Sequence, residues 1–292
     1  MAIMRFNYRS EAIGHYVDIT VTYPTDNLCY YDMAKERRHH QFPGAPAKPM
    51  YKPGMKFQTI YLIHGGGDDD SLTYRYLNSE FYAQQNCVML VTPNITNSFG
   101  VDWPDGTKYA TFLTEELPLL IQTLFASSPK REDNFIMGYA MGGNVALGTA
   151  IRRPDLYAAC VDISGGIGLT VNTDTLVDEL KDGHPFQQYN AAFGPVEQIP
   201  GSQNDMYAVG KAHLEAGVPQ PKFWILSGEK EFVRNRIKAD ADTMKEMGYD
   251  VTYLEHEGRD HDFPYWDVSV KLAMDELLPL KRTPIYPEKE EN

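Results

Sequence analysis

The sequence predicts one α/β domain with a central, mostly parallel sheet and helices on both faces. From residue 57 onward, short apolar runs alternate with longer stretches of helical periodicity, which is typical of parallel strands joined by helices. One of these runs, at residues 134–138, leads through a glycine-flanked turn into a helix. The 292 residues, 42% of them hydrophobic, suffice for a single large core, so we expect one domain over residues 1–292.

The first 56 residues do not show this alternation of apolar runs and helical stretches. Alternating segments at residues 5–9 and 15–23 suit an antiparallel edge of the sheet. Periodicity then fails between residues 24 and 56, where five prolines accompany a polar run that contains His39 and His40. Because no other metal-ligating side chain stands at ligand spacing nearby, we interpret this stretch as a solvated surface excursion.

The repeating part of the chain gives a definite list of elements. Strands are predicted at residues 59–63, 87–92, 134–138, 159–164, 223–227 and 251–255. Helices are predicted at residues 110–126, 141–152, 205–216, 233–247 and 266–278, with Pro118 expected to kink or delay the first. The interval 165–221 is only partly periodic, and we expect a cap-like or lid-like insertion over the carboxyl ends of the strands.

Composition narrows the range of functions. The formal net charge of −13 argues against a nucleic-acid partner and favours neutral or small substrates. No apolar run approaches the length of a membrane span or of a secretory signal, so a soluble cytoplasmic protein is expected, with its oligomeric state open. The three cysteines, Cys29, Cys87 and Cys160, cannot all pair, and a cysteine nucleophile is not indicated.

The strand at residues 59–63 ends in His64 and three glycines. Glycines allow backbone N–H groups to approach a ligand closely, which an oxyanion hole requires, and Gly66 is the predicted donor with His64 and Gly65 beside the substrate. A phosphate loop is disfavoured because no Lys-Ser/Thr pair follows, and the acidic residues 68–70 would repel an anion. We expect neither a metal nor a cofactor.

The strand–turn–helix around Ala140 has the form of a nucleophile elbow. The Gly-x-Ser-x-Gly pattern sets a serine on a sharp turn above the sheet, and here Gly138, Tyr139, Met141 and Gly142 surround an alanine. Its position after an apolar strand and before an amphipathic helix supports this interpretation. The N–H of Met141 is then the second predicted oxyanion donor.

Partners for a nucleophile follow in the order acid, then histidine. Glu231 comes after the strand predicted at 223–227, with Glu229 as its nearest rival, and His261 lies in the loop after the last strand. The pair His256-Glu257 does not begin a zinc-binding His-Glu-x-x-His helix, because the next histidine arrives five residues later.

Together these segments make residues 6–279 resemble the esterase D-like α/β-hydrolases, which include S-formylglutathione hydrolases, tributyrin-type carboxylesterases and feruloyl or cinnamoyl esterases. The motifs that carry the resemblance stand at residues 62–66, 92–94, 97–100, 109, 112–118, 137–143 and 261–267. The resemblance implies an α/β-hydrolase fold and acyl transfer through an acyl-enzyme, with residue 140 as nucleophile, His261 as base and Glu231 as acid. The sequence differs from the family pattern at three places: Ala140 stands where serine is expected, Glu231 where aspartate is usual, and the loop after Pro24 is unusually long.

The expected substrate is a short-chain or hydroxycinnamoyl ester. A ring or short acyl chain would suit the aromatic side chains predicted near the site: Phe99, Trp103, Phe193, Phe232, Phe263 and Tyr265. As written, the chain has no nucleophile, and neither Ser98 nor Ser164 sits in an elbow. Two hypotheses follow: a feruloyl-esterase-like carboxylesterase held as an inactive nucleophile-to-alanine form, or a natural pseudoenzyme that binds an acyl compound or a protein partner without turnover.

Overall fold

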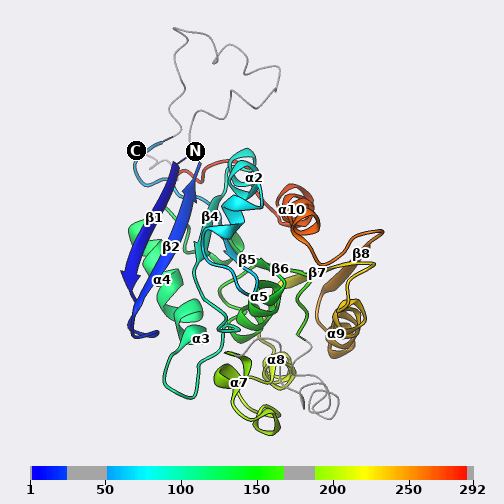
Figure 1. The fold of residues 1–292 in the computed structure, drawn as a ribbon. Coiled ribbons are helices and arrows are strands. Elements are labelled where there is room, and N and C mark those ends of the chain that lie inside the picture. Colours follow the sequence, from blue (N-terminus) through cyan, green and yellow to red (C-terminus); the bar gives the residue numbers. More distant parts are fainter. Residues whose placement is uncertain (1, 25–50, 168–187, 288–292) are drawn as a thin grey trace.

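A computed structural model describes residues 2–24, 51–167 and 188–287, which form one eight-stranded sheet flanked by helices (Figure 1). The strand order is β1-β2-β4-β3-β5-β6-β7-β8. The strands are β1 Ala2–Arg9, β2 Tyr16–Tyr23, β3 Thr59–Ile63, β4 Met89–Pro93, β5 Asn134–Tyr139, β6 Ala159–Ile163, β7 Lys222–Gly228 and β8 Val251–His256. The predicted fold class is confirmed, and every predicted strand is present.

The hydrophobic pattern of each strand matches whether it pairs in the parallel or the antiparallel direction. The alternating segments form the antiparallel edge, where β1 pairs with β2 and β2 with β4. From β4 onward all pairings are parallel, and every residue of β3, β4, β5 and β6 is buried. Strands that are covered on both faces read as continuous apolar runs, which is why the sequence located them so closely.

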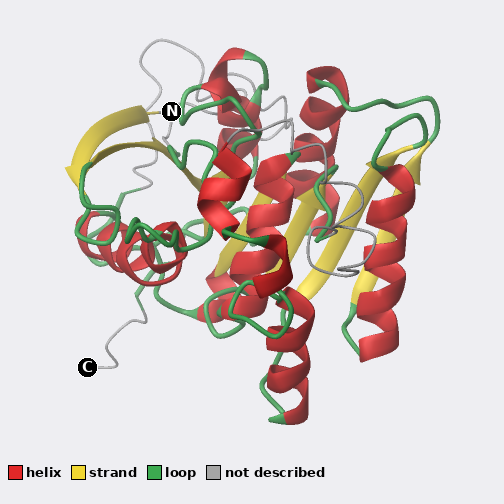
Figure 2. Cartoon of the chain, turned by 60° about the horizontal axis from the view of Figure 1, so that its bottom comes forward, coloured by secondary structure: helices red, strands yellow, loops and turns green. Residues whose placement is uncertain are grey.

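Helices cover both faces of the sheet (Figure 2). One hydrophobic cluster joins one face to α4, α5, α8 and α9, and a second joins the other face to α2 and α10. The helices are α1 Leu72–Arg75, α2 Ser79–Gln85, α3 Tyr109–Thr111, α4 Leu117–Leu124, α5 Met141–Arg152, α7 Gln188–Phe193, α8 Met206–Glu215, α9 Arg234–Met247 and α10 Phe263–Leu272. Short helices α1, α2 and α7 were not predicted.

The helix expected around Pro118 contains a wide turn instead of a simple kink. A π-helical turn, Phe112–Glu116, separates α3 from α4, and Pro118 falls in the first turn of α4. There the fixed φ of proline suits a helical first turn. The turn presents Glu116 to the β1–β2 connection, where its carboxylate accepts hydrogen bonds from the Tyr8 hydroxyl at 2.9 Å and the Glu11 N–H at 2.9 Å.

Some sequence-based expectations fall outside the described residues. These include Cys29, His39 and His40, most of the 24–56 excursion and residues 168–187 of the predicted insertion. Within the described ranges, no helix is both long and apolar enough to cross a membrane. Over the same ranges, no three His, Cys, Asp or Glu side chains are grouped so that they could hold a metal ion.

Candidate active site

The turn between β5 and α5 has the backbone of a nucleophile elbow. Ala140 takes φ 51° and ψ −125°, a conformation that strains any residue with a side chain. A Cβ on Gly138 would lie 2.2 Å from the Gly142 carbonyl oxygen, and one on Gly142 would lie 2.2 Å from the Ile63 carbonyl oxygen. Only glycine fits either position. The sharp turn is therefore enforced by backbone packing that does not depend on residue 140.

The loop after β6 supports the elbow from behind. The Ala140 N–H donates to the Ile163 carbonyl at 2.9 Å. The fully buried carboxylate of Asp162 accepts the N–H groups of Gly165 at 2.9 Å and Gly166 at 2.7 Å, and burial raises the pKa of Asp162 to about 8. Sequence reasoning missed Asp162, although a carboxylate in an otherwise apolar strand was an available signal.

The two backbone N–H groups predicted as oxyanion donors are unpaired. Neither the Gly66 N–H nor the Met141 N–H has a hydrogen-bond acceptor among the residues that the structure describes. The neighbouring Gly67 N–H is held by Asn97 Oδ1 at 2.6 Å, which ties the glycine loop to the loop after β4. Two unpaired N–H groups at a strand end and a helix start can together bind a developing oxyanion.

His64 serves the glycine loop instead of the substrate. It is 1% exposed, its Nε2 accepts the Ile95 N–H at 3.0 Å, and its Nδ1 lies 2.8 Å from the Gly65 carbonyl oxygen. The hydrogen bonds fix a neutral imidazole that donates from Nδ1, and burial lowers its pKa. We therefore remove His64 from the predicted substrate contacts.

His261 lies in the loop between β8 and α10. Its ring is half-buried and packs edge-on against Phe232 and Trp266, with centroid separations of 5.1 Å and 5.0 Å. Nδ1 is buried and has no hydrogen-bond partner within the described part of the chain. Burial lowers the pKa of His261, while Asp260 and Asp262 oppose that shift. The imidazole is thus predominantly neutral at pH 7 and able to accept a proton.

Glu231 lies at the carboxyl end of β7, but its carboxylate is engaged elsewhere. The side chain is 5% exposed, accepts a hydrogen bond from the Ser164 hydroxyl, and has Ser227 Oγ at 3.3 Å from its other oxygen. Trp266 Nε1 donates to the same Ser164 Oγ at 3.1 Å. Burial raises the pKa of Glu231, and the serine hydrogen bonds partly offset this shift. No hydrogen bond joins Glu231 to His261 in this structure.

Glu229, the rival acid, points away from this arrangement. Its side chain is exposed and accepts the Gly258 N–H at 2.8 Å. The 229–231 segment nonetheless runs beside the histidine loop, since the Lys230 N–H donates to the Arg259 carbonyl at 2.8 Å. Of the two glutamates, Glu231 is the one buried next to residues that contact His261.

Comparison with known proteins decides the family. The Esterase family profile matches residues 46–274, more than three quarters of the chain and every site segment described above. This chain belongs to the Esterase family. An acetyl esterase from Caldicellulosiruptor saccharolyticus is 28% identical over 240 residues, which cover 78% of this chain and 89% of that protein.

Solved structures of other hydrolases have the same fold as this esterase. The Staphylococcus aureus fluorophosphonate-binding serine hydrolase FphF superposes with a TM-score of 0.75 at 24% identity, covering 94% of this chain and 96% of that one. The S. aureus S-formylglutathione hydrolase FrmB gives 0.74 at 23% identity, with coverages of 94% and 97%. At these identities the similarity establishes the α/β-hydrolase fold and not a shared substrate.

The aromatic residues predicted near the site differ in burial and in packing partners. Phe99 and Phe193 pack together with centroids 5.7 Å apart, and Phe232 is 81% exposed beside His261. Phe263 is half-buried against Tyr139 and Trp266. Trp103 packs on Tyr109 and donates to the Ser98 carbonyl at 3.2 Å. Tyr265 is fully buried 3.0 Å from His256 Nδ1, so it is removed from the predicted substrate contacts.

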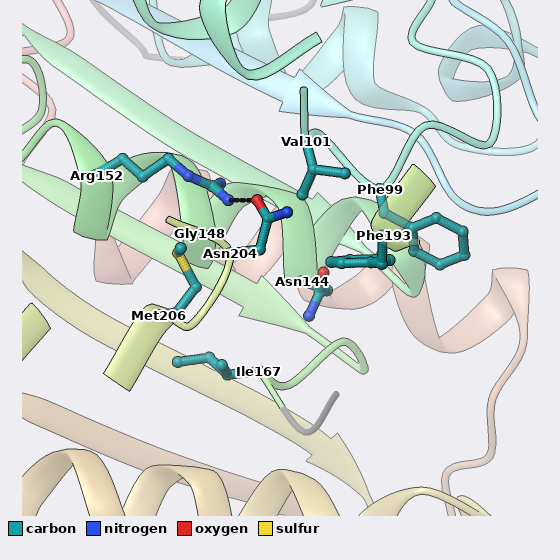
Figure 3. A pocket seen from close by; sticks show the side chains of 9 residues that line it. All are labelled: Phe99, Val101, Asn144, Gly148, Arg152, Ile167, Phe193, Asn204 and Met206. Carbon is teal, nitrogen blue, oxygen red and sulfur yellow. Dashed lines mark hydrogen bonds between the residues drawn. The ribbon is translucent and has the colours of Figure 1, made fainter. Parts of the chain in front are cut away.

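A pocket begins one helical turn beyond Ala140 and runs along α5 (Figure 3). It is small and partly open to solvent, with an accessible volume of about 20 Å³, roughly the room that one water molecule needs. Its lining comprises Phe99, Val101, Asn144, Gly148, Arg152, Ile167, Phe193, Asn204 and Met206. Two of these were predicted, Phe99 and Phe193. Polar members such as Asn144 and Arg152 were missed because the sequence does not reveal which face of a buried helix borders a cavity.

Proposed function

We propose that this esterase has the architecture of a serine carboxylic-ester hydrolase that works through an acyl-enzyme, with alanine in the nucleophile's position. The observation that carries the proposal is the strained backbone of Ala140, and it is supported by the unpaired N–H groups of Gly66 and Met141. A strained turn of this kind persists only where its surroundings enforce it, and it commonly marks a functional site.

The corresponding mechanism assigns one task to each residue. With serine at position 140, His261 accepts the hydroxyl proton while the oxygen attacks the ester carbonyl, and the two N–H groups bind the oxyanion. His261 then donates that proton to the leaving alcohol, and water releases the acyl group in a second round. Glu231 is the proposed acid that stabilises the imidazolium. In this role its carboxylate must give up a hydrogen bond from a serine hydroxyl and accept one from His261 Nδ1.

No nearby serine substitutes for the missing nucleophile. Ser164 Oγ is buried between Glu231 and Trp266, and Ser98 is fully buried with its Oγ accepting the Gly100 N–H at 3.2 Å. The chain with Ala140 should therefore bind esters without rapid turnover. The same fact supports the second candidate, a pseudoenzyme that retains an acyl-binding site or a protein partner.

Short acyl chains and hydroxycinnamoyl groups are the proposed substrates. The acetyl esterase relative supports the former, and the Phe99–Phe193 pair offers apolar walls to an aromatic ring. The thioester named for one structural neighbour is included in the test as a third class.

Restoring serine tests the proposal. Ala140→Ser should hydrolyse p-nitrophenyl acetate, methyl ferulate or S-formylglutathione at least about 10³-fold faster than the present chain, because the whole triad becomes available. Ala140→Gly is the matched control, since it changes the same position without adding a nucleophile. If the serine variant is no faster than the glycine variant on every substrate, the esterase mechanism is wrong for this chain and the binding role is favoured.

A further inference from the structure

Ser164 stands immediately after β6 in a backbone conformation that serine rarely adopts. Its φ is 62°, a positive value that strains a residue with a side chain. The Ser164 N–H donates to the Leu226 carbonyl at 2.9 Å, so β7 holds this strained residue in place. Ser164 is 2% exposed, so it does not act on a substrate directly. A strained and buried serine at this strand end indicates a role that acts through a neighbouring side chain.

The hydroxyl of Ser164 has a fixed direction. Trp266 Nε1 donates to Ser164 Oγ at 3.1 Å, and the Ser164 hydroxyl donates to Glu231 Oε1. The indole has only a donor, so it must use a lone pair of Ser164 Oγ, which leaves the hydroxyl proton for Glu231. A hydrogen bond to an ionised carboxylate is roughly twice as strong as one between neutral groups. One oxygen of the Glu231 carboxylate is thereby held firmly.

The second oxygen of Glu231 is held less firmly. Ser227 Oγ lies 3.3 Å from Glu231 Oε2 and 3.2 Å from the Gly228 carbonyl oxygen, so its single proton has two acceptors within reach. A buried donor needs only one of them. Oε2 can therefore leave Ser227 without stranding the serine hydroxyl.

Trp266 also contacts the other two parts of the proposed catalytic centre. Its ring stacks on Tyr139, which precedes Ala140, with centroids 4.9 Å apart, and it meets the His261 ring edge-on at 5.0 Å. His261 Nδ1 is buried and has no hydrogen-bond partner within the described ranges. When His261 takes up a proton, Nδ1–H therefore needs an acceptor. Of the two oxygens of Glu231, Oε2 is the one that can supply it.

We propose that Ser164, oriented by Trp266, is a positioning residue for the acid: it keeps Oε1 of Glu231 fixed while Oε2 moves from Ser227 to His261 Nδ1. The inference rests on the proposed esterase mechanism and names the serine that gives up its hydrogen bond. The movement accompanies proton uptake by His261, so it belongs to the transition state and not to substrate binding.

The ionisation of Glu231 depends on the same hydrogen bond. Burial raises the pKa of Glu231, and the hydrogen bond from Ser164 opposes that shift. Without this hydrogen bond Glu231 should take up a proton more readily and stop stabilising the His261 cation. Other titratable groups face the pair and are retained in every variant below: Asp162 in β6, Asp260 and Asp262 in the histidine loop, and Tyr265 in α10.

An NMR titration of the present Ala140 chain tests the proposal without any need for turnover. The His261 imidazole resonances, assigned by comparison with His261→Ala, report its pKa. Ser164→Ala should lower the His261 pKa relative to the parent chain, because a protonated Glu231 no longer favours the imidazolium. Ser227→Ala is the matched control, since it removes a buried serine hydroxyl from the other oxygen of the same carboxylate. It should raise the His261 pKa, because Oε2 becomes free for Nδ1.

A second variant guards against a folding defect in Ser164→Ala. Trp266→Phe keeps a ring against Tyr139 and His261 but removes the indole N–H, so the Ser164 hydroxyl loses its fixed direction and the His261 pKa should again fall. An unchanged or higher pKa in either variant, or an equal fall in Ser227→Ala, would overturn the proposal.

Turnover extends the test in the Ala140→Ser form. There Ser164→Ala should lower kcat for p-nitrophenyl acetate roughly tenfold and leave KM within about twofold, the pattern of an interaction made only in the transition state. A rise in KM with kcat retained would contradict the positioning role. A serine form that hydrolyses nothing would refute the esterase mechanism, while the titrations still decide whether Ser164 directs Glu231.

Discussion

The elbow and the histidine loop are the two halves of the proposed catalytic centre, and they are organised in opposite ways. At the elbow, backbone atoms set the geometry: Cβ atoms on Gly138 or Gly142 would meet main-chain oxygens at 2.2 Å. In the histidine loop, side chains set it. The buried Nδ1 of His261 has no described partner, and Glu231 is hydrogen bonded to serines.

This difference shows which part of the proposed catalytic centre depends least on the residue at position 140. Main-chain packing at the elbow is coupled to the core of the sheet, so it remains whatever residue stands at position 140. The alignment of acid and base depends on a few rotamers near the surface. Catalytic hydrogen bonds in unliganded enzymes are often long and tighten only when substrate binds.

The largest expected effect concerns the base. In the Ala140→Ser form, His261→Ala should lower kcat/KM for p-nitrophenyl acetate by about 10³-fold or more, since no other group can take the serine proton. His256→Ala is the control: its Nδ1 lies 3.0 Å from the Tyr265 hydroxyl, and the change should alter the rate only a few fold. A mild effect at His261 together with a severe one at His256 would reverse the assignment.

The two regions should also respond differently to an added methyl group. Gly142→Ala drives a Cβ into the Ile63 carbonyl and should lower the free energy of unfolding by at least about 3 kcal/mol. Gly258→Ala in the histidine loop meets nothing within 4 Å and carries only the strain of φ +70°, about 1 kcal/mol. Urea denaturation measures both, and equal losses would show that the elbow is less constrained than its packing indicates.

The choice of acid gives a smaller effect. In the serine form, Glu231→Gln should reduce kcat by about 10²-fold, because a neutral amide cannot stabilise the imidazolium. Glu229→Gln, which changes an exposed side chain bound to the Gly258 N–H, should stay within about threefold of the parent. Steady-state rates at saturating substrate decide between them, and the reverse ranking would make Glu229 the acid.

The smallest effect is a displacement of the pH profile. His261 must be neutral to act as base, and burial lowers its pKa, so kcat/KM of the serine form should fall only as pH drops through a midpoint below the ordinary 6.5 of histidine. Because kcat/KM reports the free enzyme, a midpoint above 6.5 would mean that Glu231 already lies on Nδ1 before substrate binds, since a carboxylate partner favours the imidazolium.

The elbow was predictable because its constraints are local. Apolar strands buried on both faces, the glycines around residue 140 and the helix that follows all lie within one short segment, and α5 Met141–Arg152 has the predicted bounds. The last helix starts earlier than predicted, at Phe263 instead of 266, because the Asp262 side chain accepts the Tyr265 N–H at 2.9 Å and caps it.

For the proposed acid and base, the sequence predicted which loops carry the side chains but not which contacts the side chains make. Its detail depends on Ser164, Ser227 and Trp266, which come from three separate elements and follow no spacing rule. The same reason hid Arg152. Its place in the pocket depends on Gly148, one helical turn earlier, and on Asn204, which comes from a distant segment.

The strand order also has a consequence for the nascent chain. The β1–β2 hairpin is synthesised before the rest of the sheet, yet β2 pairs with β4, where Ile19 lies opposite Pro93 and Thr22 opposite Leu90. At typical rates of synthesis, roughly ten seconds pass between completion of β2 and completion of its partner. During that interval one edge of β2 is open, with the side chains of Ile19 and Val21 uncovered although they are fully buried in the finished sheet. We therefore expect the open edge of β2 to benefit from protection by a chaperone until β4 is synthesised.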